Sequence, residues 1–177
     1  LYVSKDGTLW VGTDGGLSYF DAKTERFHTY NQQDTWLVDE NGHKQKISGY
    51  SVKAIVEDKN GDLLIGTWSS GLMRFKRKAH TMYRYPKLNA TNSAYSLFFD
   101  KRHRLWVGTW GYGVVRLDNP GNVKQPGAHQ YPYSANHFDT FYKIVHDPVT
   151  RTLWACTREG VCYLEEDIPN AEWKEYS

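Results

Sequence analysis

The pentapeptide LWVGT occurs twice in this chain, at Leu9–Thr13 and at Leu105–Thr109. Two close variants, LLIGT and LWACT, occupy residues 63–67 and 153–157. Aligning the four copies on their last residue gives spacings of 54, 42 and 48 residues. Repeats of this length are typical of β-propeller blades or of helical arrays. The chain is therefore expected to consist of one structural unit repeated four times.

The segments around the repeated pentapeptide have the pattern of strands. They are short, rich in β-branched and aromatic residues, and bounded by Gly, Asn and Asp, and they lack apolar residues at helical spacing. The clearest unit contains four such runs in succession, SVKAIVED (51–58), DLLIGTW (62–68), LMRFKR (72–77) and TMYRYP (81–86). Four antiparallel strands in each repeat are the defining feature of a propeller blade.

The sequence thus predicts an all-β fold, a β-propeller fragment with about four blades of four-stranded antiparallel sheet. We expect one partial propeller domain over residues 1–177, in which the first blade is incomplete because the start of the chain clips its first strand. The predicted blades cover approximately residues 1–30, 50–86, 94–133 and 140–177, and residues 31–49 are expected to form an inserted loop.

The composition of the pentapeptide fits a strand that is covered on both sides. In a propeller each blade lies between two others, so a central strand is buried on both faces and consists of consecutive apolar residues. We expect Leu9 and Val11 to face one neighbouring blade and Trp10 to face the other. Gly12 is expected to leave room for a close approach, as glycine in a strand often does.

Longer stretches around these copies resemble the two-component-regulator propeller repeat. They are VKAIVEDKNGDLLIGTWSSGL (52–72) and AYSLFFDKRHRLWVGTWGYGV (94–114), and SKDGTLWVGTDGGLSYF (4–20) resembles the latter half of the repeat. The last copy departs from the pattern, since Cys156 replaces the motif glycine. The resemblance implies a segment of the extracytoplasmic, periplasmic sensor domain of a hybrid two-component system, a kind of protein common in gut Bacteroidetes.

The same resemblance implies that the full-length protein is anchored in the inner membrane, carries a histidine kinase and forms a homodimer. It also implies that the ligands are oligosaccharides derived from glycans. About four blades leave two blade faces uncovered, so further propeller blades or self-association are expected as partners. The formal net charge of +2 and the interspersed acids and bases argue against nucleic acid as a partner.

Aromatic residues on the predicted loops are the candidate ligand-binding groups. Trp68, Trp110 and Tyr112 lie on the loops between the second and third strands of two blades, and indole rings can cover the apolar faces of sugars. Trp36 lies on the inserted loop, which is expected to project on the same face, and Arg158 is a candidate polar anchor. The alternative that Trp68 and Trp110 only cap their blades stays open.

No set of catalytic or metal-binding residues is recognisable. The segment DKNGD (58–62) begins like a calcium loop but lacks its later glycine and glutamate, so no metal and no cofactor is expected. The loop acids Asp14, Asp39 and Glu159 do not recur as a pair, so this chain is not expected to be an enzyme. A propeller-type glycoside hydrolase or lyase, and a purely structural interaction module, remain as alternatives.

The two cysteines, Cys156 and Cys162, flank a predicted tight turn in the last repeat. They form either a cross-strand disulfide or two small apolar side chains in a sheet. The sequence does not decide between these alternatives, because the answer depends on the register of the two strands.

Overall fold

The computed structural model describes residues 1–30, 35–47, 49–88, 92–133, 140–166, 168 and 171–176. These residues form four β-sheets that follow one another along the chain, and a short 3₁₀ turn, η1 (Arg77–Ala79), joins two of the strands. The all-β fold predicted from the sequence is confirmed. No helix within the described ranges is long and apolar enough to cross a membrane.

Each repeat supplies one sheet, and we refer to the sheets as blades one to four. Blade one has the strand order β1-β2-β3-β4, with β1 (Tyr2–Val3), β2 (Leu9–Thr13), β3 (Gly16–Asp21) and β4 (Arg26–Thr29). Blade two has the order β6-β5-β10-β9-β8-β7, with β5 (Trp36–Val38), β6 (Lys44–Lys46), β7 (Ser51–Glu57), β8 (Leu63–Trp68), β9 (Leu72–Lys76) and β10 (Thr81–Arg84). Blade three contains β11 (Ala94–Phe99), β12 (Leu105–Thr109), β13 (Val114–Leu117) and β14 (Ala128–Tyr131). Blade four contains β15 (Lys143–Asp147), β16 (Thr152–Cys156), β17 (Val161–Glu165) and β18 (Lys174–Glu175).

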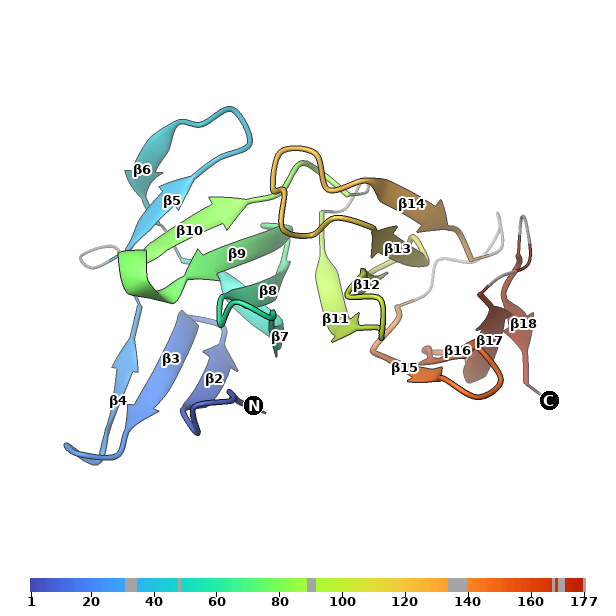
Figure 1. The fold of residues 1–177 in the computed structure, drawn as a ribbon, viewed down its shortest axis with the longest axis horizontal. Helices are drawn as coiled ribbons and strands as arrows, with labels where there is room; N and C mark the ends of the chain where they lie inside the picture. The colour runs from blue at the N-terminus through green and yellow to red at the C-terminus, as the bar shows by residue number, and fades with distance from the viewer. Residues whose placement is uncertain are drawn as a thin grey trace.

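The four blades fan out in an arc (Figure 1). On its inner side β7 packs against β2 and β11, and β11 packs against β15. Each blade therefore stands face to face with the next, as in a β-propeller. We call the side of the arc that carries the turns between the second and third strands of each blade the mouth face.

The second residue of the repeated pentapeptide points toward the following blade. Trp10 of blade one is 2% exposed and packs in one cluster with Leu63 and Ile65 of blade two. Trp106 of blade three is fully buried and shares a cluster with Leu153 of blade four. The indole rings of blades one and three are thus covered by the next blade.

The first and third residues of the pentapeptide point the other way, because side chains alternate along a strand. Leu105 and Val107 of blade three pack in the same cluster as Leu64 of blade two, the preceding blade. By the same alternation Leu9 and Val11 lie on the face of blade one that is turned away from blade two, where both are half-buried. The predicted alternation is therefore confirmed for Trp10 and for the motif of blade three, and a neighbouring blade over Leu9 and Val11 stays a prediction.

The glycine of the pentapeptide leaves room for the backbone at the start of the next blade's inner strand. A Cβ atom placed on Gly66 would lie 2.7 Å from the carbonyl oxygen of Ala94, and one on Gly108 would lie 2.8 Å from that of Phe141. Ala94 begins the inner strand of blade three, and Phe141 leads into that of blade four. A side chain at either position would push the blades apart, which explains why glycine recurs there.

The threonine of the pentapeptide closes the turn at the mouth face. The Thr67 hydroxyl donates a hydrogen bond to the carbonyl oxygen of Gly71 at 2.7 Å, and Thr109 makes the same bond to Gly113 at 2.8 Å. Both glycines have positive φ, at 79° and 71°, which residues with side chains rarely adopt. The repeated sequence is therefore one unit of packing and turn formation.

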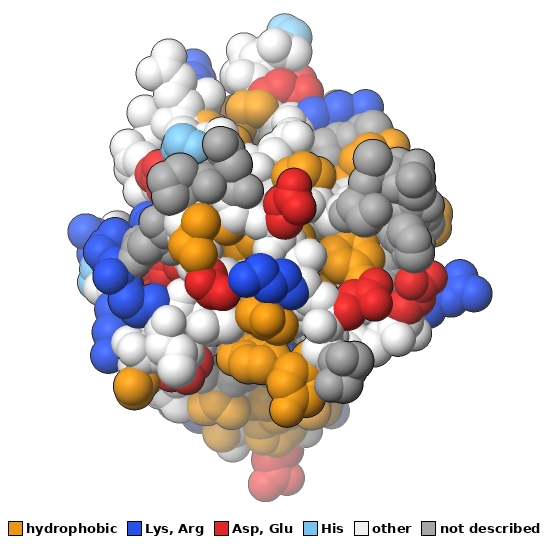
Figure 2. Space-filling model, turned by 90° about the vertical axis from the view of Figure 1, so that its right-hand side faces the viewer, with side chains coloured by type: hydrophobic (Ala, Val, Ile, Leu, Met, Phe, Trp, Pro, Cys, Tyr) orange, Lys and Arg blue, Asp and Glu red, His pale blue; other side chains and the backbone are white. Residues whose placement is uncertain are grey.

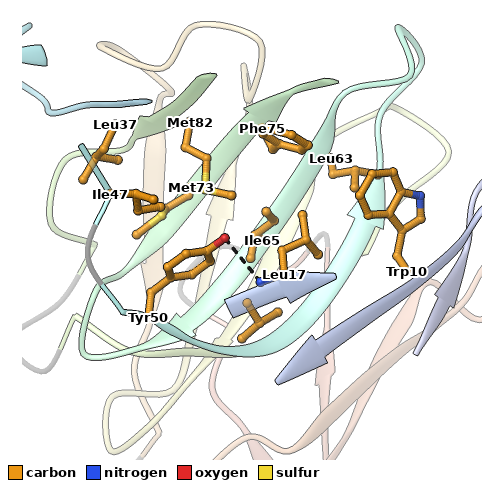
Figure 3. Packing of buried hydrophobic residues seen from close by; sticks show 11 residues of the cluster. Trp10, Leu17, Leu37, Ile47, Tyr50, Leu63, Ile65, Met73, Phe75 and Met82 are labelled. Atoms are coloured by element: carbon orange, nitrogen blue, oxygen red, sulfur yellow. Dashed lines mark hydrogen bonds between the residues drawn. The ribbon is translucent and has the colours of Figure 1, made fainter. Parts of the chain in front are cut away.

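The segment between blades one and two is not a loop throughout, and this part of the prediction is wrong. Its strands β5 and β6 form a hairpin that extends blade two outward, because β5 pairs in parallel with β10. Leu37 and Ile47 of this segment are buried with Met82 of β10, as Figure 3 shows. The hairpin covers a strand that would otherwise be the exposed edge of the blade.

The same cluster joins the hairpin to blade one. The Tyr50 hydroxyl, at the end of the inserted segment, accepts a hydrogen bond from the backbone N–H of Leu17 at 3.3 Å (Figure 3). Leu17 and Tyr50 are both buried in this cluster. The inserted segment therefore contributes to the interface between the first two blades.

Cys156 and Cys162 are not bonded to each other, so the disulfide alternative is wrong. Cys156 pairs with Val161 and Cys162 pairs with Ala155, which places the two thiols on opposite faces of the sheet. Cys162 is buried against blade three, whereas Cys156 is exposed on the outer face of blade four.

The outer face of blade four is the counterpart of the faces that the other blades bury. Its motif residue Trp154 is only half-buried and packs against Tyr163 and Tyr176, with ring centroids 5.2 and 5.5 Å away. Hydrophobic side chains gather on this face beside charged ones, as Figure 2 shows. Cys156 stands there at the position of the motif glycine.

Candidate functional site

The inner strands of blades two and three carry a matching irregularity near the mouth face. The pairing of β7 with β8 shifts between Val52 and Ala54, and that of β11 with β12 shifts between Ala94 and Ser96. The additional residues are Lys53 and Tyr95. Bulges of this kind often redirect a side chain next to a binding site.

Tyr142 takes the corresponding place in blade four. It precedes Lys143, which pairs with Cys156, just as Tyr95 precedes Ser96, which pairs with Gly108. The Tyr142 backbone N–H donates a hydrogen bond to the carbonyl oxygen of Cys156 at 3.0 Å. Three successive blades therefore present Lys53, Tyr95 and Tyr142 at the same level of the inner side.

Four aromatic rings form a continuous group at this level, which we call the mouth cluster: Trp68, Tyr95, Trp110 and Tyr142. The rings of Trp68 and Trp110 lie 4.7 Å apart at an interplanar angle of 62°. Tyr95 lies 5.7 Å from Trp68 and 6.0 Å from Tyr142, with both pairs close to perpendicular. Such edge-to-face contacts hold aromatic rings in fixed orientations.

The inner strands enclose a hollow of about 270 Å³ beside the mouth cluster. Its lining includes aliphatic, aromatic and cationic residues: Leu1, Gly12, Val52, Lys53, Ala54, Ile55, Tyr95, Ser96, Leu97, Tyr142 and Lys143. Binding pockets commonly join apolar walls with a few polar groups in this way. The hollow and the mouth cluster share Tyr95 and Tyr142, so we treat them as one candidate site.

An ion pair crosses from blade one to blade two at the edge of the hollow. The Lys53 ammonium lies 3.1 Å from the Asp14 carboxylate, which also accepts a hydrogen bond of 2.5 Å from the Ser51 hydroxyl. The Ser51 hydrogen bond and then the Lys53 charge hold the pKa of Asp14 below its usual value. Asp14 is therefore ionised and fixes the position of Lys53.

The hydroxyl of Tyr95 remains protonated over the physiological pH range. Burial raises the pKa of Tyr95, and the nearby charge of Lys53 opposes this shift only in part. A protonated phenol both donates and accepts hydrogen bonds, as do the hydroxyls of a saccharide. The candidate site thus offers ring surfaces and phenol groups to a ligand, with the Lys53 ammonium beside them.

The residues predicted from the sequence to bind a ligand do not all lie at one place in the structure. Trp68 and Trp110 lie together in the mouth cluster, and Tyr112 is 45% exposed on the adjoining turn of blade three. Arg158 is exposed on the corresponding turn of blade four. Trp36 does not reach the mouth face: it pairs with Thr81, next to the turn between β9 and β10, at the opposite end of blade two.

Trp36 instead lies in a basic environment on the hairpin. Trp36 is 36% exposed, and the ammonium groups of Lys44 and Lys46 lie 4.6 and 4.1 Å from the centroid of its ring. The expectation that this tryptophan projects with the mouth residues is wrong. The parallel pairing of β5 with β10 decides its position, and this pairing depends on tertiary structure.

Sequence reasoning missed Lys53, Tyr95 and Tyr142. A signal was present, because the third and fourth inner strands begin with similar runs, AYSLFFD and FYKIVHD, that each place a tyrosine at the start. The direction of these side chains could not be predicted from the sequence, because it depends on the irregular pairing of the inner strands. Within the described ranges, no group of three or more His, Cys, Asp or Glu could hold a metal ion.

The resemblance to the calcium loop has another structural explanation. Asp58 accepts hydrogen bonds from the backbone N–H groups of Asn60 and Asp62, at 2.7 and 3.0 Å. Its other carboxylate oxygen pairs with the Arg74 guanidinium at 2.5 Å. These contacts close the turn between β7 and β8, so the acidic spacing here serves the turn.

The fold and the repeated junctions define a segment of a β-propeller. Residues 46–69 and 89–111 match the two component regulator propeller family. The chain thus carries two-component-regulator propeller repeats, as the resemblance in its sequence predicts.

Individual proteins are similar to the chain over different lengths. A histidine kinase, P4, from Formosa agariphila is 33% identical over 87 residues, which are 46% of this chain and 6% of the kinase. The extracellular domain of one putative hybrid two-component system of B. thetaiotaomicron superposes with a TM-score of 0.65 at 22% identity, over 97% of this chain and 20% of that domain. A second such domain gives 0.60 at 16% identity, over 99% and 29%. The chain therefore spans less than a third of each of these proteins.

Proposed function

We propose that this chain is part of the periplasmic sensor region of a hybrid two-component system and that its candidate site binds oligosaccharides derived from glycans. The observation that carries this proposal is the mouth cluster, four aromatic rings in contact with one another, two of which, Tyr95 and Tyr142, line the hollow at the inner side of the propeller. Sugar rings have apolar C–H faces that pack on aromatic rings and hydroxyls that bond to polar groups at the edge.

The site is suited to recognition without turnover. A glycosidase of the usual kind needs two carboxyl groups flanking one bond. Among the described residues that line the hollow none carries a carboxylate, and the Asp14 carboxylate, which contacts the lining residue Lys53, is also bonded to Ser51. In the proposed system the chain binds a saccharide in the periplasm, and a histidine kinase elsewhere in the membrane-anchored, homodimeric protein transmits the signal.

Calorimetric titration of the chain with a panel of oligosaccharides from plant, algal and host glycans tests this proposal. Saturable binding of at least one saccharide, without any change in the sugar, supports it. A panel that produces no binding contradicts it. Release of new reducing ends or unsaturated products would instead support the alternative of a propeller-type hydrolase or lyase.

We also propose that a further propeller blade covers the outer face of blade four. The three junctions within the chain each cover the second residue of the pentapeptide, whereas Trp154 is left half-exposed. The Cys156 side chain occupies the space through which an entering strand passes at the other junctions. The covering blade is therefore expected to lie farther from blade four than blades two, three and four lie from the blades that they cover.

Site-directed crosslinking in the full-length protein tests this arrangement. A photocrosslinking residue in place of Val161, which pairs with Cys156 on this face, should capture a propeller strand of the same polypeptide. Capture of a second subunit, or full reactivity of Cys156 in the full-length protein, would contradict it.

A further inference from the structure

The chain enters blades two, three and four with a hydroxyl-bearing residue at the same position. These residues are Ser51, Ser93 and Thr140. Each lies three residues before the inner-strand residue that pairs with the fourth position of the pentapeptide. Ser93 and Thr140 are buried. The repeat therefore places a hydroxyl group at the start of each of these blades, next to the mouth face.

Each of the three residues contacts the turn between the second and third strands of the preceding blade. In the first junction the hydroxyl donates a hydrogen bond of 2.5 Å to the Asp14 carboxylate. In the second, the hydroxyl of Ser93 accepts a hydrogen bond from the backbone N–H of Ser69 at 3.0 Å. In the third, Thr140 pairs with Trp110 in an isolated antiparallel bridge. The same position thus contacts a turn of the mouth face in all three junctions.

The bond to Ser93 falls at a strained position of the backbone. Ser69 directly follows Trp68 and has a φ of 61°, in the left-handed region that residues with a side chain rarely adopt. The equivalent residue of blade three is Gly111, which has a φ of 82° at no steric cost. Such strain persists where surrounding contacts hold the backbone. The Ser93 hydroxyl supplies a contact of this kind to the turn after Trp68.

The ring of Trp68 contacts the same segment of blade three. Tyr95 lies two residues after Ser93, and its ring is 5.7 Å from that of Trp68 and perpendicular to it. The Trp68 ring also lies 4.7 Å from that of Trp110. A shift of the turn after Trp68 would therefore change both ring contacts.

We propose that Ser93 is a positioning residue of the candidate site: its hydroxyl holds the turn after Trp68, and this turn sets the contacts of Trp68 with Trp110 and Tyr95. A ligand then meets rings that are already in place, so binding does not include the cost of ordering them. This inference deepens the proposed function, and its affinity measurement rests on that function.

Circular dichroism tests the ring geometry without a ligand. Two indole rings in contact give an exciton band in the far ultraviolet, and Trp110→Phe in the full chain identifies the band of the Trp68–Trp110 pair. We expect Ser93→Ala to lose most of this band. Ser18→Ala removes another buried serine hydroxyl, which bonds to Thr29 within blade one, and should keep the band.

A second substitution shows whether Ser93 acts through the turn. Ser69→Gly removes the strain of the positive φ, so it should restore most of the band when it is added to Ser93→Ala. Chemical denaturation first checks that each variant is folded. Ser93→Cys, whose thiol is a weak hydrogen-bond acceptor, replaces Ser93→Ala in both comparisons if that variant does not fold.

Saccharide affinity completes the test. With a saccharide of the panel that binds the wild-type chain, Ser93→Ala should weaken binding about threefold or more, and Ser18→Ala should not. If Ser93→Ala keeps either the band or the affinity, or if Ser69→Gly does not restore the band, the positioning role is overturned while saccharide binding stands. If no saccharide binds, the proposed function is overturned, and the exciton band still decides whether Ser93 positions Trp68.

Discussion

The indole rings of Trp68 and Trp110 lie 4.7 Å apart although 42 residues separate them in the chain. Each follows the last residue of a repeated pentapeptide, so they occupy the same place in two adjacent blades. Their contact is a direct consequence of the repeat, because successive blades present equivalent residues side by side at the mouth face. A linear repeat thereby produces a localised aromatic site.

Enlarging the motif glycine should weaken the junction between blades two and three. A Cβ on Gly66 would lie 2.7 Å from the Ala94 carbonyl oxygen, and two backbone segments cannot easily move apart. We expect Gly66→Ala to lower the free energy of unfolding by about 2–3 kcal/mol. Gly49→Ala, where nothing lies within 4 Å, should cost less than about 0.5 kcal/mol in the same chemical denaturation experiment. Equal effects of the two variants would contradict the account of the motif.

The contribution of the motif threonine to the free energy of unfolding should depend on how deeply its hydroxyl is buried. Thr67→Val removes a buried hydroxyl that donates to the Gly71 carbonyl at 2.7 Å, and we expect a loss of about 1–2 kcal/mol of unfolding free energy. Thr157→Val removes the equivalent hydroxyl in blade four, which is exposed and bonds to Gly160 at 3.3 Å. Its effect should stay within about 0.5 kcal/mol, because water can replace the bond. The reverse order of the two effects would be incompatible with this explanation.

The two cysteines should differ in reactivity. Cys156 is exposed and Cys162 is 1% exposed, and neither is oxidised in the structure. A maleimide added to the folded chain without reductant should modify one thiol quickly, and mass spectrometry should place the label on Cys156. The second thiol should react only in denaturant. A protein with no reactive thiol before reduction would indicate the disulfide that the register of β16 and β17 excludes.

Asp100 should make stability depend on pH. Burial raises the pKa of its carboxyl group, but hydrogen bonds from the Trp106 indole and from Arg104, together with the Arg104 charge, lower it below the usual value overall. A carboxyl whose pKa is lower in the folded state stabilises the fold fully above its unfolded pKa, near pH 4, and this contribution is lost as pH falls through the folded pKa.

Asp100→Asn should therefore cost about 2–4 kcal/mol at pH 7, because it leaves Arg104 without this partner. The variant should also lose less of its remaining stability than the wild type between pH 5 and pH 2. Asp118→Asn, at a half-exposed ion pair with Arg116, should cost no more than about 1 kcal/mol. Chemical denaturation curves measured across this pH range test the prediction. Equal losses of unfolding free energy in Asp100→Asn and in the wild type would contradict it.

The blade packing was predictable because it is local and repeated. The alternation of Leu9, Trp10 and Val11 assigns each side chain to one face before any partner is known, and Gly12 indicates a close neighbour. The hairpin was not predictable in this way. Strand β6 has the sequence KQK and all three residues are exposed, so neither apolar periodicity nor strand propensity identifies it. The free edge of β10 decides where the hairpin packs.

The candidate site was predictable only in part. Trp68 and Trp110 follow a recognisable motif, so their shared position could be read from the repeat. Tyr95 and Lys53 depend on an additional residue in each inner strand, and a bulge becomes visible only when the partner strand is paired. The position of Trp36 depends on which end of β10 receives β5, and no local pattern contains that information.

Saccharide affinity of tryptophan variants tests the central claim most directly. With a saccharide that binds the wild-type chain, we expect Trp110→Ala to raise the dissociation constant about tenfold, because one wall of the mouth cluster is lost. Trp36→Ala removes a partly exposed tryptophan at the opposite end of blade two and should leave the affinity unchanged. Unchanged affinity in Trp110→Ala, or an equal loss in both variants, would contradict the assignment of the mouth cluster as the binding site.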